Sequence, residues 1–575
     1  MTMQGVDRRR VVAGLALAGS ATAATGWART GPSAAQIAET CQPLTGLNFT
    51  DAEQHQMLGM IDDIVERARA TAALDLNNAL PPAELFDPRL PGWQATERAL
   101  ARRRPPVAPP IPRDAESIAF APAWQLSQWI AGRKISCRAL TDIYLNRIAL
   151  YGPKLECIAT AMADRAREQA DLLDRELWGG KWRGPLHGLP YGLKDLIDVA
   201  GVRTAWGAAP YRNRVADSDA TIVERLREAG AVLLAKTTCG AIAYGDIWYG
   251  GRTRNPWNIE EGSSGSSAGS ASAVAAGLCA FAIGTETMGS IVAPSARCGT
   301  VGLRPTFGRV PRTGAMALCW SLDKVGVLAR DAADMADVLE VFNGSDGVDP
   351  CAVDAPLAVA PAVDPRETRL GYRPEWFAQG LETDRAALDA ARQAGFQLVE
   401  IDLPDIDLNL LGSLVVTEAA AAFETLTASG QDDLMTWQDD IAWPNSWRAM
   451  QFQNAVGYVQ AQRVRRQLMI DFATTMEGVD AILHPNDAGG LLAIGNHCGY
   501  PALVLPTGTL EQPTRTGFAS HVATGDIPQG AALHKVPYAV TLTGKLFDEP
   551  ALLEIGARIS EKLALGPLIP PMGAR

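Results

Sequence analysis

Apolar residues recur at helical intervals after residue 136. Leu140, Ile143, Tyr144 and Ile148 fall on one face of a helix, because residues three or four positions apart are neighbours on a helical surface. The same kind of spacing predicts a second helix from about residue 159 toward 177. The chain therefore enters its main folded part through amphipathic helices.

A helix followed by a wholly apolar run is the next pattern. Ile222, Val223 and Leu226 form the inner face of a helix that begins near 217 and ends at Gly230, and residues 231–235 are all apolar. An apolar run of that length is typical of a strand buried on both faces by helices. The alternation returns with a helix at 271–276 and strands at 279–283, 301–303 and 479–483. We predict one α/β domain over residues 116–565, followed by a tail at 566–575.

The residues before this domain have a different pattern. Met57, Met60, Ile61 and Ile64 mark one side of a helix within residues 51–75, and a polar, proline-rich stretch then runs through 102–112. Such a stretch is a stiff linker. Residues 29–115 are therefore predicted to be a helical extension joined to the domain by that linker.

The first 28 residues have the pattern of an export signal. Arg8, Arg9 and Arg10 precede an apolar run at 11–24 of small residues, with a cleavage option at 21–23. The run is too short to span a bilayer. The consecutive arginines are similar to a bacterial twin-arginine signal and predict a periplasmic or secreted protein. A disordered basic start is the alternative.

Composition restricts the partners and the chemistry. The chain is 47% hydrophobic and 20% charged, with a net charge of −12, so we expect a soluble enzyme and no nucleic-acid partner. Nine cysteines are scattered with no C-x-x-C pair, and the six histidines include no H-E-x-x-H pattern. Neither a disulfide framework nor a metal site is predicted.

A glycine- and serine-rich run at 262–270 is the first segment that points to chemistry. Most such runs are flexible linkers. This run instead leads directly into a helix and a strand, where glycine usually serves close approach or unusual backbone angles. It is not a phosphate-binding loop, because no lysine follows the second glycine at the required place.

Several ordered motifs, spread over about 116–565, resemble the amidase-signature family. They are Gly184–Pro190 leading to Lys194-Asp195, Gly265–Gly269, Gly284–Ser290, Cys298-Gly299, Gly302–Thr306, Ser321–Asp323, Arg330-Asp331, Asn496–Gly508 and Phe547–Glu549. Ordered motifs over that length are far more specific than any one of them. The resemblance implies a single domain with a mixed twisted sheet covered by helices on both faces, and it leaves residues 29–115 outside.

The resemblance also implies a catalytic group, Ser–cis-Ser–Lys. Carried over, the lysine base is Lys194, the relay is Ser266 and the nucleophile is Ser290. A serine hydroxyl needs a neighbouring base, and a lysine becomes one only where burial favours its neutral form. The oxyanion hole would use backbone N–H groups of Thr287, Met288 and Gly289, with that of Ser290 itself. No metal or organic cofactor is implied.

Four positions depart from the family pattern. The family usually has Gly where Ala268 and Met288 stand, Asp where Glu286 stands and Arg where Val292 stands. Met288 is predicted to narrow the acyl side of the substrate site, or to disturb the oxyanion hole if its backbone needs a positive φ. Glu286 and Val292 indicate a rewired support for the loop that carries Ser290.

The predicted function is hydrolysis of a linear amide C–N bond, giving a carboxylate and ammonia or an amine through an acyl-enzyme on Ser290. Two alternatives remain open. One is an amidotransferase A-type subunit that releases ammonia for a partner acting on charged tRNA, which an export signal disfavours. The other is a catalytically silent protein that keeps the fold and pocket. The expected partner is a small amide substrate, and the sequence names neither that amide nor the oligomeric state.

Overall fold

The computed structural model of the chain describes residues 33–572, except 37–38, 41, 46–49, scattered positions between 57 and 76, 80–83, 95–106, 356, 358–362, 487 and 516–529. The predicted export signal at 1–28 lies outside the described residues, as does most of the predicted helix after residue 56. The chain divides into two compact units, Met1–Leu76 and Asn77–Arg575. Helices α2 (Ala34–Gln36) and α3 (Gln42–Thr45) belong to the first unit. No helix in the described ranges is long and apolar enough to cross a membrane.

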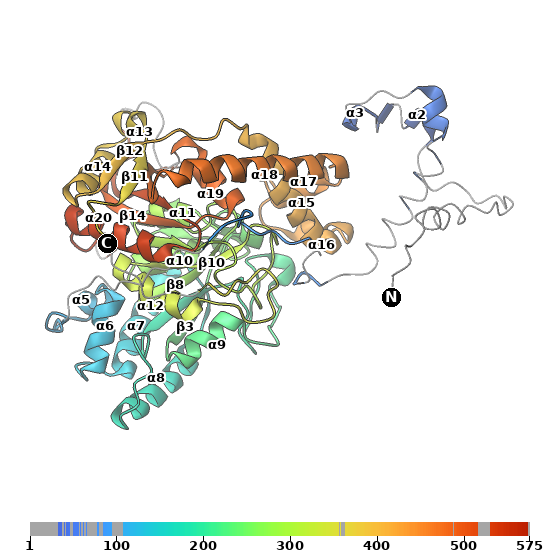
Figure 1. Cartoon of the computed structure of the whole chain (residues 1–575). Coiled ribbons are helices and arrows are strands. Elements are labelled where there is room, and N and C mark those ends of the chain that lie inside the picture. Colours follow the sequence, from blue (N-terminus) through green and yellow to red (C-terminus); the bar gives the residue numbers. More distant parts are fainter. Residues whose placement is uncertain are drawn as a thin grey trace, which may run out of the picture. The chain divides into compact units, whose positions relative to one another are not determined.

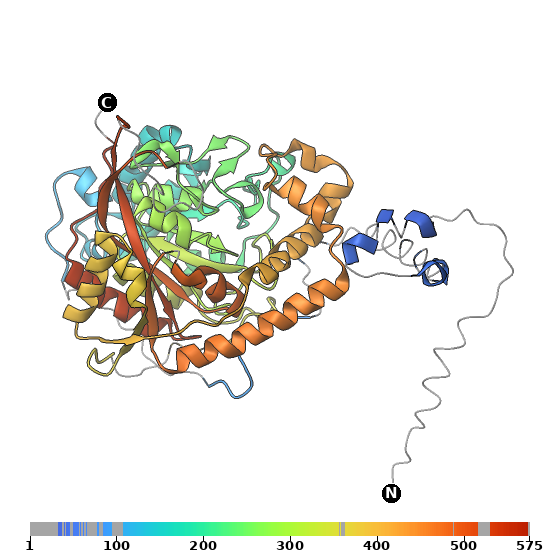
Figure 2. The ribbon, with the colours of Figure 1, turned by 90° about the horizontal axis from the view of Figure 1, so that it is seen from above.

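The second unit is built on a mixed sheet of eleven strands (Figures 1 and 2). In spatial order the strands are β1 (Ile158–Ala161), β3 (Val232–Thr237), β2 (Pro190–Lys194), β8 (Phe281–Glu286), β10 (Lys324–Ala329), β9 (Val301–Arg304), β14 (Ala502–Gln512), β15 (His534–Gly544), β13 (Ala481–Pro485), β11 (Arg369–Tyr372) and β12 (Gln397–Glu400). Strand β2 runs parallel to β3 and β8, whereas β10 runs antiparallel to β8 and β9, so the prediction of a mixed sheet is confirmed.

Helices pack on both faces of this sheet. Those that matter for the site are α10 (Ala268–Ala275) and α11 (Val292–Cys298), which contact each other, and α12 (Ala332–Phe342), α15 (Gly412–Ala422), α18 (Ala455–Glu477) and α19 (Leu491–Cys498). The others are α5 (Ala115–Ala119), α6 (Ala123–Ala131), α7 (Cys137–Leu155), α8 (Ala163–Trp178), α9 (Thr221–Glu228), α13 (Pro374–Ala378), α14 (Glu382–Gln393), α16 (Glu424–Ala428), α17 (Trp443–Met450) and α20 (Glu549–Leu563). Short hairpins β4–β5 (247–252) and β6–β7 (254–262) precede α10.

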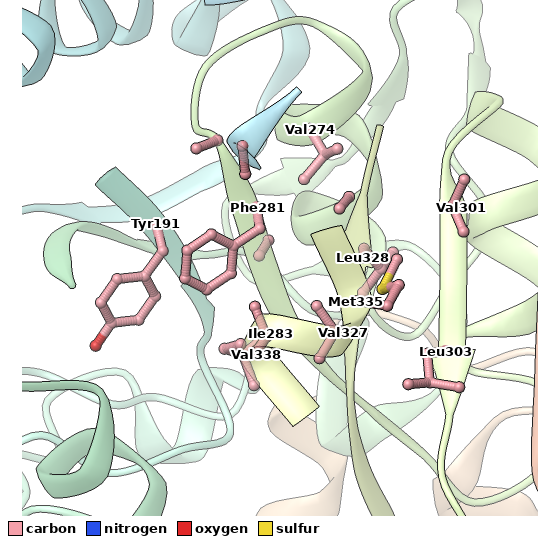
Figure 3. Packing of buried hydrophobic residues seen from close by; sticks show 14 of the residues in the cluster. Tyr191, Val274, Phe281, Ile283, Val301, Leu303, Val327, Leu328, Met335 and Val338 are labelled. Carbon is pink, nitrogen blue, oxygen red and sulfur yellow. The ribbon is translucent and has the colours of Figure 1, made fainter. Parts of the chain in front are cut away.

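Successive side chains along β8 point to opposite faces of the sheet, and the two faces have different surroundings. Ile283 lies in the apolar core with Met335 and Val338 of α12, as Figure 3 shows. On the opposite face, a Cβ added at Gly284 would lie 2.6 Å from the hydroxyl of Ser267, at the start of α10. Successive residues of a strand point to opposite faces, so the strand has α12 on one side and the catalytic helix α10 on the other. The core also stacks the rings of Tyr191 and Phe281 at 5.5 Å.

Most of the predicted elements are present. The helices predicted after 136, at 217–230 and at 271–276 correspond to α7, α9 and α10, and the predicted strands correspond to β3, β8, β9 and β13 with ends shifted by up to three residues. The helix predicted from 159 was wrong at its start. Residues Ile158–Ala161 pair antiparallel with β3 as an edge strand, and the helix begins at Ala163. Pairing with the sheet overrides the local helical pattern there.

The sheet brings the three motif regions to one edge. Because β2 and β8 are parallel, Lys194 at the end of β2 and Glu286 at the end of β8 lie at the same edge. Residues 287–291 connect β8 to α11, and residues 263–267 lead into α10. Lys194, Ser266 and Ser290 are therefore carried by a strand end and two strand-to-helix loops.

Helix α10 approaches its neighbours backbone to backbone. A Cβ at Gly269 would overlap the amide nitrogen of Thr238 and lie 2.5 Å from the carbonyl oxygen of Cys157. Both atoms belong to the backbone, which cannot move aside as the end of a flexible side chain can. Because Gly269 has no side chain, the first turn of α10, which follows Ser266, can lie directly against the backbone of Thr238 and Cys157.

We predict that Gly269→Ala destabilises the protein by about 2 kcal/mol or more, because it forces that turn away from its neighbours. Gly412→Ala is the matched control, since nothing lies within 4 Å of the added Cβ and the residue begins a helix. Its free energy of unfolding should stay within about 1 kcal/mol of wild type. Urea denaturation followed by circular dichroism measures both. Equal stability of the two variants would contradict this packing account.

Candidate active site

Lys194 is buried among hydroxyl and carbonyl oxygens. Its Nζ donates to Ser266 Oγ at 2.8 Å, to Ser267 Oγ at 3.1 Å and to Thr285 Oγ1 at 2.7 Å, and it lies 3.2 Å from the Thr285 carbonyl oxygen. The side chain has no exposed surface. Among the described residues Lys194 forms no ion pair. The predicted contact between base and relay is thus present, and all its other partners are neutral.

Burial favours the neutral form of this lysine. It lowers the pKa of the Lys194 amine to about 7, against weaker opposing effects of Cys239, Asp323 and Glu286. A lysine with an unperturbed pKa of about 10.4 is almost entirely charged at neutral pH. In this site a large fraction of Lys194 is neutral there, and at 2.8 Å the Ser266 hydroxyl can then donate its proton to the nitrogen lone pair.

Ser266 follows a cis peptide bond after Gly265, as the resemblance implies. A Cβ at residue 265 would overlap the carbonyl group of Gly245, so only glycine fits there. The relay serine is fully buried. Its neighbour Ser267 also belongs to the hydrogen-bonded group, because its hydroxyl donates to the Thr285 carbonyl at 3.0 Å and accepts from the Thr285 N–H at 3.1 Å.

Ser290 is held beside the segment that contains Ser266. The backbone N–H of Ser267 donates to the carbonyl oxygen of Ser290 at 3.1 Å, which ties the loop at 263–267 to the loop at 287–291. Ser290 keeps 7% of its surface exposed, unlike Ser266 and Lys194. In the described chain its hydroxyl makes no hydrogen bond to Ser266. Catalytic hydrogen bonds are often long in a free enzyme and shorten when substrate binds.

Glu286 holds the loop that carries Ser290. Its Oε2 accepts from the N–H groups of Ile291 at 2.8 Å and Val292 at 2.9 Å, directly after the nucleophile. Its Oε1 accepts from Arg304 at 2.7 Å and from the side-chain amide of Asn496 at 2.9 Å. Burial disfavours the charged carboxylate, but the charges of Arg304 and Lys324 and these hydrogen bonds outweigh it and hold the pKa of Glu286 at about 2.

This arrangement explains two of the departures. The cation missing at Val292 is not needed to pair with Glu286, because Arg304 of β9 does so from a neighbouring strand. Val292 instead packs in a small apolar cluster with Ala296 and Val504. The acid–cation support of the nucleophile loop is therefore retained with different residues.

Asp323 supports the same loop from the other side. Its Oδ1 accepts from the hydroxyl of Thr287 at 2.6 Å, and its Oδ2 accepts from the N–H groups of Leu318 and Cys319. Burial raises the pKa of this carboxyl group, and its hydrogen bonds oppose that shift. Thr287 is thus anchored by its side chain while its N–H stays in the predicted oxyanion hole.

Met288 and Gly289 complete that loop. Gly289 has a φ of +90°, a conformation that favours glycine, whereas Met288 is not among the residues with positive φ. The concern that a side chain at Met288 would need a positive φ therefore does not arise. Met288 is half-buried, and its part in the acyl side of the substrate site stays a prediction.

Sequence reasoning missed several members of this site. Ser267, Thr285, Arg304 and Asn496 lie within the quoted motifs, but only the structure shows that they bind Lys194 or Glu286.

Within the described ranges no cluster of His, Cys, Asp and Glu could hold a metal ion. A cavity of about 1280 Å³ lies between α6 and the end of α20, and Lys194, Ser266 and Ser290 do not line it.

Comparisons with known proteins identify the family of the chain. A family model described as Amidase matches residues 139–553. The A-type subunit of glutamyl-tRNA(Gln) amidotransferase from Roseiflexus castenholzii is 34% identical over 463 residues, covering 75% of this chain and 94% of that protein. The corresponding subunit of Halorhodospira halophila is 33% identical over 472 residues, with coverage of 76% and 96%. The crystal structure of peptide amidase from Stenotrophomonas maltophilia is similar, with a TM-score of 0.65 and 28% identity over 79% of this chain and 99% of that one. The chain therefore belongs to the amidase-signature family.

Proposed function

We propose that the chain hydrolyses a carboxylic amide through an acyl-enzyme on Ser290, with Ser266 as relay and Lys194 as base. The observation that carries this proposal is the buried Lys194 amine, 2.8 Å from Ser266 Oγ and with its pKa lowered to about 7. A lysine with a purely structural role needs neither a lowered pKa nor contact with the hydroxyl of a buried serine. A base must be neutral and in hydrogen-bond contact with the group that it deprotonates.

The chemistry proceeds in two halves. Neutral Lys194 takes the proton of Ser266, which takes the proton of Ser290, while Ser290 Oγ bonds to the amide carbon. The negative oxygen of the tetrahedral intermediate receives hydrogen bonds from N–H groups of residues 287–290. The C–N bond then breaks as the proton passes back through Ser266 to the leaving nitrogen. Water repeats the sequence on the ester, and the carboxylate and Ser290 are released.

A second candidate is an A-type amidotransferase subunit, in which the same half-reaction releases ammonia for a partner. The curated relatives favour this candidate over a free-standing amidase, because the amidotransferase subunits share more identity with the chain than the peptide amidase does.

Ammonia release by the purified chain from an amidated dipeptide and from L-glutamine separates the two candidate functions. Turnover of the dipeptide without any partner supports the free-standing amidase, and activity on glutamine alone supports the amidotransferase subunit.

We predict that Ser290→Ala lowers kcat/KM for amide hydrolysis by at least about a thousandfold, because the acyl-enzyme cannot form. Ser295→Ala is the matched control. Ser295 is a buried serine five residues further on, and its hydroxyl has no hydrogen-bond partner in the described chain. That variant should keep wild-type activity and stability. Wild-type turnover by Ser290→Ala would show that another residue is the nucleophile.

The pH dependence of activity follows from Lys194. Its pKa is lowered in the folded protein, so the neutral, active form is lost as pH falls. We predict that kcat/KM rises with pH up to about 7 and is then level over the next two pH units. Lys194→Arg should be inactive over this whole range, because arginine stays protonated. A wild-type profile that is flat from pH 5.5 to 8.5 would argue against a neutral lysine as the base.

We further propose that the arginine-led start directs export, on the basis of the sequence pattern at residues 1–28 alone. Replacing Arg8 and Arg9 with lysine should leave full-length precursor in the cytoplasmic fraction of a bacterial host. Immunoblots of the cytoplasmic and periplasmic fractions measure this, with the wild-type chain as the control. Shortened protein in the periplasm at the wild-type level would show that the paired arginines do not act as an export signal.

A further inference from the structure

Residues 77–94 precede the part of the chain that matches the family and yet contact its catalytic end. They belong to the second compact unit, whereas the family model begins at residue 139. Residues 77–79 and 84–94 of this segment are described. We name the segment the N-terminal strap. Its described side chains reach the loop at 317–323 by two separate routes.

The first route is the side chain of Asn78. Its Nδ2 donates to the carbonyl oxygen of Ala317 at 2.8 Å, and the N–H of Ala317 donates to Asn78 Oδ1 at 2.9 Å. This reciprocal pair reproduces the bonds that a neighbouring strand would make. The Asn78 Nδ2 also lies 3.3 Å from the carbonyl oxygen of Ala422 in α15, and the indole N–H of Trp320 donates to the Asn78 carbonyl at 3.2 Å. The side chain of Asn78 thus holds Ala317 in the loop and the end of α15, and its backbone carbonyl holds Trp320.

The second route passes through Arg465 of α18. The ring of Phe86 lies 3.5 Å from the guanidinium carbon of Arg465, which is 2% exposed. The two terminal nitrogens of Arg465 donate to the hydroxyl and to the carbonyl oxygen of Ser321, both at 2.9 Å. Stacking on an aromatic ring fixes the plane of a guanidinium and so the direction of its hydrogen bonds.

The first route continues to Asp323, whereas the second ends at Ser321 in the same loop. The N–H groups of Leu318 and Cys319, next to Ala317, donate to Asp323 Oδ2, and Asp323 Oδ1 accepts from Thr287. Thr287 begins the loop whose N–H groups form the predicted oxyanion hole. A continuous set of hydrogen bonds therefore runs from Asn78, through residues 317–319 and Asp323, to Thr287.

We propose that the N-terminal strap positions the oxyanion loop, with Asn78 as a positioning residue that acts through Asp323 and Thr287. This rests on the proposed function, because it assigns the loop at 287–290 to the oxyanion. Residues that lie outside the part of the chain matched by the family model thus contribute to the reaction by positioning this loop. Oxyanion donors must be placed within a fraction of an ångström, and small displacements of catalytic groups reduce rates strongly.

Asn78→Ala tests the proposal, with Asn77→Ala as the matched control. Asn77 is the exposed neighbour, and its side chain accepts a local bond from Ala79. The readout is labelling of the full chain by an alkyl fluorophosphonate, whose phosphoryl oxygen occupies the oxyanion hole. Asn78→Ala should lower the maximal labelling rate, kinact, by about tenfold and leave the half-saturating concentration, KI, unchanged. Asn77→Ala should label as wild type does.

A double-mutant cycle with Thr287→Val separates positioning from simple stability. Thr287→Val removes the hydroxyl that contacts Asp323, so Asn78→Ala should lower kinact by less than about twofold in that background. An equal drop in both backgrounds would overturn the proposal. So would wild-type labelling by Asn78→Ala, or a drop that matches a loss of folded protein in thermal denaturation. Labelling of the wild-type chain that persists in Ser290→Ala would instead refute the proposed nucleophile, independently of Asn78.

Discussion

The site depends on keeping one lysine uncharged inside the protein. Lys194 has no exposed surface, and its partners are the hydroxyls of Ser266, Ser267 and Thr285 and a carbonyl oxygen, none of which carries charge. Removing an ammonium from water is costly unless an anion compensates. Without such an anion the cost lowers the pKa of the amine. The same burial that would destabilise a charged lysine therefore favours the neutral amine that the proposed mechanism needs.

The nearby carboxylates are arranged so that they do not reverse this effect. Asp195 follows Lys194 in the chain but is bonded to the ammonium of Lys236 at 3.1 Å. Glu286 is paired with Arg304 at 2.7 Å and bound by two backbone N–H groups of the nucleophile loop. Each of these acids has its own cation, and the opposing effects of Cys239, Asp323 and Glu286 on the Lys194 pKa stay smaller than that of burial. The same pairs also fix the end of β2 that carries Lys194 and the loop that carries Ser290.

The sequence was sufficient for the parts of this site that are local. The motifs around Lys194, Ser266 and Ser290 indicated the candidate catalytic residues, the alternation of helices and apolar runs indicated an α/β domain, and the family resemblance implied that its sheet is mixed. It could not show that Arg304 supplies the cation absent at Val292, because that pairing depends on how β8 and β9 are placed about β10. The edge strand at Ile158–Ala161 was missed for a similar reason, since its pairing with β3 is a tertiary contact.

The bond between Asn78 and Ala317 joins residues 239 positions apart. No periodicity reports a contact of that kind, and the segment that contains Asn78 lies outside the motifs. Patterns in the sequence thus gave a prediction of which residues react, whereas the residues that hold them in place appeared only in the folded chain.

Titration of the Lys194 amine shows whether this lysine is neutral in the working enzyme. The chain can be prepared with 15N-labelled lysine, and the Lys194 resonance assigned by its absence in Lys194→Met. Nitrogen NMR then follows its chemical shift from pH 5.5 to 9. We predict that the amine titrates with a midpoint at about pH 7. A Lys194 resonance that remains that of an ammonium up to pH 9 would show that the lysine stays charged and cannot be the base.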